Sequence, residues 1–179
     1  MAENNQKSLI KEIPINSASY VQILNLLGNF YCNGKIILKK FLIPQTFQPS
    51  VASDMNEGNF LEIFQMNQGL GIISSIYNAN DIDYQTKFKV FDFLSFNESL
   101  KEILTIGSAY NKINQTEIRT LISLLNGFLL DKDRSEDLII NYFTGAWNSW
   151  FFDIFWDYTY LIYGKTSGFL WLLSITDED

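Results

Sequence analysis

Residues 152–176, FDIFWDYTYLIY-GKTSG-FLWLLSIT, decide the fold of this chain. Two runs rich in aromatic and β-branched residues, at 152–163 and 169–176, flank the segment 164–168. This segment contains two glycines, a serine and a threonine, which are typical of turns. The pattern predicts a C-terminal β-hairpin. If all five residues form the loop, Tyr163 pairs with Phe169, and the register of the whole hairpin follows from that pair.

In this register Asp157 lies opposite Ile175, and Asp153 lies opposite Asp179. Because side chains alternate along a strand, four carboxylates share one face at the open end of the hairpin. They belong to Asp153, Asp157, Asp177 and Asp179. The other face, which includes Trp156, Tyr160, Leu170 and Leu172, is expected to be core. A shift of one residue in the pairing would separate these groups.

Capping boxes, in which a side chain at the helix start pairs with Glu or Gln three residues later, predict several amphipathic helices. They begin at Ser19, Asn59, Ser95 and Asn114. A fifth helix is expected after Ser135, carrying Leu138, Ile139, Tyr142 and Phe143 on one side. Residues 35–43, 70–77 and 84–90 are expected to be strands, and residues 44–58 a loop. Without regular βαβ alternation, these elements predict one α+β domain over residues 1–179, with helices packed on an antiparallel sheet.

Composition narrows the functional classes. The chain has no histidine and a single cysteine, Cys32. It therefore lacks the commonest general base and the residues for a Ser-His-Asp triad or a Cys/His zinc site. The glycines form no phosphate-binding loop. We expect a protein without enzymatic activity, cofactor or metal. Since no signal peptide, apolar span or disulfide pattern is evident, we also expect a cytoplasmic location.

The formal net charge is −7, and residues 131–179 hold nine acidic residues against three basic ones. Such a surface repels nucleic acid and anionic membranes, and it attracts a basic protein. The same charge could serve solubility alone. The sequence does not distinguish a monomer from a dimer. Lys35, Lys39 and Lys40 form a small basic group, which we interpret as an exposed strand face rather than a phosphate site.

Aromatic residues crowd the start of the hairpin, from Trp147 to Trp156. Most such rings are expected in the core. One or two exposed rings beside Asp153 and Asp157 would form an anchor for a basic protein. The predicted partner-binding residues are Asp153, Trp156, Asp157, Asp177 and Asp179. The same carboxylates could instead be a solvated edge that discourages aggregation, or a site for Ca²⁺ or Mg²⁺.

The segments 156–163 and 169–177, WDYTYLIY and FLWLLSITD, resemble the closing hairpin of small acidic immunity-type proteins of bacteria. The resemblance implies an inhibitor that binds a cognate toxin and masks its active site. It implies no particular binding residue, because these proteins share no fixed binding motif.

Two other functions remain open at this point. One is an enzyme or binding domain that uses carboxylates, with or without a metal, on a small ligand. The other is a structural or phage-assembly subunit, for which exposed strand edges would matter.

Overall fold

The computed structural model describes residues 10–62, 76–107 and 114–177. Within these ranges, six strands form one antiparallel sheet in the order β1-β2-β6-β5-β4-β3. The strands are β1 (Lys11–Glu12), β2 (Lys35–Leu42), β3 (Lys89–Phe91), β4 (Leu138–Thr144), β5 (Tyr158–Gly164) and β6 (Phe169–Thr176). The predicted α+β class, with amphipathic helices on an antiparallel sheet and a C-terminal hairpin, is confirmed.

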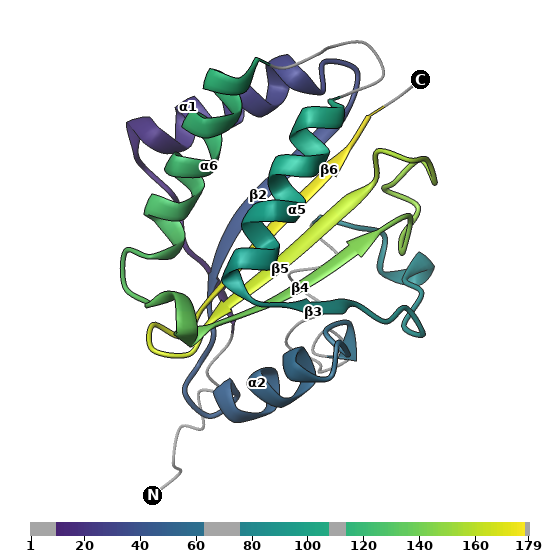
Figure 1. Cartoon of the computed structure of the whole chain (residues 1–179). Helices are drawn as coiled ribbons and strands as arrows, with labels where there is room; N and C mark the ends of the chain where they lie inside the picture. Colours follow the sequence, from purple (N-terminus) through teal and green to yellow (C-terminus); the bar gives the residue numbers. More distant parts are fainter. Residues whose placement is uncertain (1–9, 63–75, 108–113, 178–179) are drawn as a thin grey trace, which may run out of the picture.

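Helices cover one face of this sheet, as Figure 1 shows. They are α1 (Ala18–Phe30), α5 (Phe93–Ile106) and α6 (Gln115–Leu129), whereas α2 (Gln48–Asn56) lies on the opposite face. Tyr160 of β5 and Leu173 of β6 face the three helices. Leu161 and Leu172, their neighbours in sequence, pack with Val51 and Met55 of α2. The central hairpin is therefore buried on both faces.

Side-chain caps explain where the helices begin, and they correct two predicted starts. Asn114 caps α6 as expected, with its Oδ1 2.9 Å from the amide nitrogen of Glu117. Helix α1 is capped by Ser17 instead of Ser19, and α5 by Asp92 instead of Ser95. In both cases an earlier polar side chain reaches the free amide of the first turn.

Three other local predictions change. Residues 44–58 were expected to be a loop, but α2 forms there with Pro49 in its first turn, where proline is tolerated. Of the strand expected at 84–90, only residues 89–90 belong to β3; Tyr84 and Gln85 lie in a turn, and residues 86–88 have no regular secondary structure. Most of the strand expected at 70–77 and most of the helix expected after Asn59 lie outside the described residues, and residues 76–77 form a turn and a bend.

The prediction of a helix after Ser135 is wrong. Ser135–Asp137 form a single 3-10 turn, and Leu138–Thr144 continue as β4. Residues 138–142 are all buried, because the sheet is covered on both faces. A strand of this kind carries a continuous apolar run without alternation, and such a run also fits a helix.

Buried polar contacts join the sheet to the layer on the α2 side. The indole nitrogen of Trp147 donates to Thr159 Oγ1 at 2.9 Å, and the oxygens of Tyr77 and Ser174 lie 2.6 Å apart. The Asn141 side chain donates to the carbonyl oxygen of Met55 at 2.7 Å. The side chains of Thr159 and Ser174 and the side-chain nitrogen of Asn141 thereby meet a partner, which a buried polar group requires.

Candidate binding surface

The register of the hairpin separates the predicted acidic residues. Tyr163 pairs with Leu170, one residue away from the expected partner, and Tyr158 pairs with Ile175. The shift arises because Gly164 belongs to β5, and the turn is closed by Gly168, whose φ is 69°. Leu170 and Leu172 consequently lie on the face opposite Tyr160. The same register separates Asp157 from Asp177, which the sequence predicts on one face.

The five residues predicted to bind a partner do not share one environment. Asp157 and Asp177 are fully buried, whereas Asp153 is exposed in a left-handed conformation with φ 57°. Trp156 is half-buried, and Asp179 lies outside the described residues. The strand expected from residue 152 begins at Tyr158, so residues 152–157 form a loop instead. The expected surface of aspartates is therefore not present in this form.

Asp157 fastens this loop to the sheet. Its Oδ2 accepts a hydrogen bond from the Ile154 amide at 2.9 Å, and its Oδ1 accepts one from the Thr176 hydroxyl. The carbonyl oxygen of Asp157 also accepts from the amide of Gly145 at 2.9 Å. A carboxylate that accepts several hydrogen bonds is suited to a buried position. These contacts show a structural part for Asp157.

The loop exposes one of the aromatic rings that precede β5. Trp147 and Phe151 are buried and pack against Tyr77, as most of the cluster was expected to do. Phe155 is 62% exposed, and its ring lies at a right angle to that of Trp156, with 5.8 Å between centroids. Phe155 is therefore an exposed ring of the kind that the alternative of a binding anchor requires, although Asp157 is buried.

Phe155 stands at the end of a groove of about 420 Å³ between α5 and the β3–β4 edge. We call it the α5–β4 groove. Its walls include Glu98, Glu102 and Ile106 of α5, Tyr142 of β4, Tyr158 of β5, and Phe155. Phe91 of β3 stacks on Tyr142 with 5.1 Å between centroids. The groove thus combines two carboxylates with several aromatic faces.

The carboxylates belong to an exposed row on α5. Leu94, Glu98, Glu102 and Ile106 follow one another at intervals of four residues, and all four are exposed. Leu94 is 74% exposed and Ile106 is 45% exposed, so each end of the row presents a large apolar side chain to solvent. Isolated exposed apolar residues are common, but apolar residues that flank charges beside a groove are typical of binding sites.

The inner wall of the groove contains tyrosines with perturbed acidity. Burial raises the pKa of Tyr158 above its usual value, and the charges of Tyr142 and Glu102 add to this effect. Burial likewise raises the pKa of Tyr142. The phenol oxygen of Tyr158 is buried without a hydrogen-bond partner among the described residues. Both phenols therefore stay neutral to a higher pH than a solvent-exposed tyrosine does.

The sequence does not predict this groove. Ser95 and Glu98 fit a capping box, and the prediction of the helix rests on its buried apolar stripe alone. The available signal was the four-residue spacing of Leu94, Glu98, Glu102 and Ile106, in which apolar residues lie off that stripe. The aromatic wall of the groove cannot be predicted from the sequence, because the pattern around Tyr142 predicts a helix instead of a strand.

The described residues contain no cluster of three or more Asp, Glu or Cys side chains that could hold a metal ion. None of the described helices is long and apolar enough to cross a membrane. No protein-family model matches the chain, and no curated protein matches it.

We expect the protein to unfold in alkali as its buried tyrosines ionise. Burial raises the pKa of Tyr163 to about 12, and it raises that of Tyr160 further. An unfolded tyrosine ionises near pH 10. The folded state therefore keeps protons that the unfolded state releases, so stability is complete below about pH 10 and falls as the pH rises towards 12.

Urea unfolding across this pH range measures the loss, together with tyrosinate absorbance. The part of the absorbance that comes from the buried tyrosines should rise only as the protein unfolds, and Tyr163→Phe should lessen the alkaline loss. Full tyrosinate absorbance in a folded protein would contradict the expectation.

Proposed function

We propose that this chain is a non-enzymatic inhibitor of the immunity type, which binds a basic partner protein, a toxin or effector, through the α5–β4 groove. The observation that carries the proposal is the exposed row on α5, where Glu98 and Glu102 stand between Leu94 and Ile106 beside aromatic walls. This site replaces the hairpin end suggested by sequence reasoning.

The chemistry of the groove fits a lysine or arginine side chain. A guanidinium or ammonium group can pair with Glu98 and Glu102, and the exposed ring of Phe155 favours a cation above its face. Leu94 and Ile106 then cover apolar surface of the partner around the charged contact. Among the described residues that line the groove, Lys89 alone is basic, so the two carboxylates exceed its charge.

The charge of the whole protein supports the same partner. A net charge of −7 attracts a basic protein at long range and increases the rate of association. The groove then supplies the short-range contacts that charge alone lacks. An inhibitor of this type requires no catalytic residue, since binding alone masks the surface of its partner.

The test is a calorimetric titration of the protein against the product of the adjacent gene, at low and at physiological salt. We expect one-to-one binding that weakens with salt. Glu98→Gln with Glu102→Gln should weaken binding at least about tenfold. Each carboxylate that pairs with a cation of the partner contributes about 1 kcal/mol or more once the interface excludes water.

The matched control removes the same charge from the opposite face. Glu57→Gln with Glu62→Gln changes two exposed carboxylates at and beyond the end of α2. Affinity should stay within about twofold of the wild type, since only long-range attraction changes. Equal losses in both double variants would show that net charge alone acts, and no binding by the wild-type protein would overturn the proposal.

A further inference from the structure

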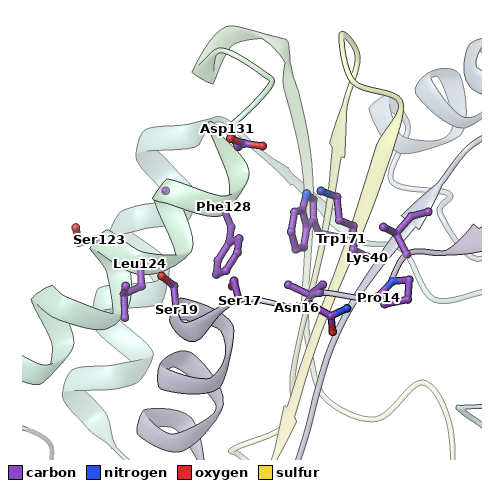
Figure 2. Close-up of a pocket in the computed structure, with 13 residues that line it drawn as sticks. Pro14, Asn16, Ser17, Ser19, Lys40, Ser123, Leu124, Phe128, Asp131 and Trp171 are labelled. Carbon is purple, nitrogen blue, oxygen red and sulfur yellow. The ribbon is translucent and has the colours of Figure 1, made fainter.

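A second hollow lies on the helical side of the sheet, between β2, the segment before α1, and α6. It has a volume of about 470 Å³, within the range of small-molecule sites. We call it the β2–α6 pocket. Figure 2 shows Lys40 and Trp171 side by side on the sheet, with Phe128 of α6 facing them across the pocket.

The sheet aims Lys40 into this pocket. Lys40 pairs with Trp171 across β2 and β6, and the alternation of side chains directs both towards the helices. The neighbouring Lys39 points to the other face, where it pairs with Glu12 at 2.5 Å. The basic group of Lys35, Lys39 and Lys40 expected from the sequence is therefore divided, and only Lys40 lines the pocket.

The ammonium group of Lys40 is held by aromatic rings instead of a carboxylate. Its Nζ lies 3.8 Å from the ring centroid of Phe169 and 4.6 Å from that of Trp171. The ammonium of Lys132 approaches the same Phe169 ring at 5.4 Å. Within residues 10–62, 76–107 and 114–177, no carboxylate forms an ion pair with either lysine.

Two cations beside one ring repel each other, and an anion placed between them relieves this repulsion. Burial and the charge of Lys132 both lower the pKa of Lys40, and the charges of Asp131 and Asp133 act against this effect. Asp133 Oδ1 already accepts hydrogen bonds from the backbone amides of Thr166 and Ser167, with donor–acceptor distances of 3.0 Å each. Asp131 is exposed at the rim, where solvent screens its charge.

The remaining walls suit a planar apolar group. Phe128 and Trp171 lie 5.8 Å apart between centroids, and Ile15 and Leu124 extend the apolar surface. Ser17 and Ser19 bring hydroxyl groups to the same wall. A cation, hydroxyl donors and an aromatic surface in one concave site are the features that recognise a small organic anion.

We propose that the β2–α6 pocket binds a small organic carboxylate with a planar apolar body. The carboxylate pairs with Lys40, and the body lies against Phe128 and Trp171. This site is separate from the α5–β4 groove, and the inference does not depend on the proposed inhibitor function.

The test uses 2-naphthoate and its uncharged counterpart 2-naphthamide as probes of the intact protein, with calorimetry and the indole cross-peak of Trp171 in ¹H–¹⁵N spectra. We expect naphthoate to bind and to shift this cross-peak, and naphthamide to bind at least about tenfold more weakly, because a hydrogen bond to a charged group contributes more than a neutral one.

Two variants complete the experiment. Lys40→Met keeps the length of the side chain and removes its charge, so it should abolish the preference for naphthoate. Lys39→Met removes a charge one residue away on the other face and should leave binding unchanged. Circular dichroism confirms that both variants fold. Equal binding of the two probes, an unaltered preference in Lys40→Met, or no binding of naphthoate at millimolar concentration would each overturn the proposal.

Discussion

Replacing Asp157 with alanine should lower the free energy of unfolding by about 3 kcal/mol. The carboxylate is fully buried and accepts hydrogen bonds from the Ile154 amide and the Thr176 hydroxyl. Alanine leaves the buried Thr176 hydroxyl and the partly buried Ile154 amide without this acceptor, and hydrogen bonds to charged groups contribute about 1.5–3 kcal/mol each. Asp157→Asn should cost about 1 kcal/mol, since its amide oxygen can still accept one bond and the Thr176 hydroxyl can turn to accept another.

Urea denaturation measures these changes, and Asp153→Asn is the matched control. Asp153 is exposed, and asparagine tolerates its left-handed conformation, so stability should change by less than about 0.5 kcal/mol. If Asp157→Ala kept full stability but lost the partner, Asp157 would be a binding residue, as sequence reasoning proposed.

Gly34→Ala should destabilise the protein by about 3 kcal/mol, at the upper end of the cost of overpacking. A Cβ atom on Gly34 would stand 1.8 Å from the carbonyl oxygen of Thr176 and 2.8 Å from the Cα atom of Asp177. Both obstacles are backbone atoms, so neither can move aside by a change of rotamer. The end of β6 would have to separate from the start of β2, where Lys35 pairs with Thr176.

The same substitution at Gly28 should have the opposite sign. Gly28 lies inside α1, and a Cβ atom there would meet nothing within 4 Å. Alanine in a helix is more stable than glycine by about 0.5–1 kcal/mol. Thermal and urea unfolding of the two variants together check the prediction, and equal effects at both positions would contradict it.

The fold class followed from the sequence because its strongest signals were local. Residues 169–176 and the turn before them are recognisable without knowledge of the rest of the chain, and Asn114 marks the start of α6 by its own spacing. The errors concern information that only packing supplies. Leu138 to Tyr142 are buried on both faces, so their pattern contains no alternation that would separate a strand from a helix.

The candidate site was less predictable for a related reason. The site predicted from the sequence depends on the hairpin register, and the inclusion of Gly164 in β5 shifts that register by one residue. This change moved Asp157 from the expected surface into the interior. The α5–β4 groove is formed by residues of α5, β3, β4, β5 and the loop before β5, and their proximity follows from the strand order rather than from any motif.

The position of β6 in the sheet also has a consequence for biosynthesis. Strand β6 lies between β2 and β5, so eight residue pairs join Lys35–Leu42 to a strand made more than a hundred residues later. While the ribosome still covers β6, β1 is the only strand of the described residues that can pair with β2, and it does so over two residue pairs. The edge of β2 that faces β6 stays unpaired. Contacts so distant in sequence form slowly. We therefore expect the sheet to be completed only after β6 has left the ribosome, and a chain truncated before residue 169 to lack the strand that joins β2 to β5.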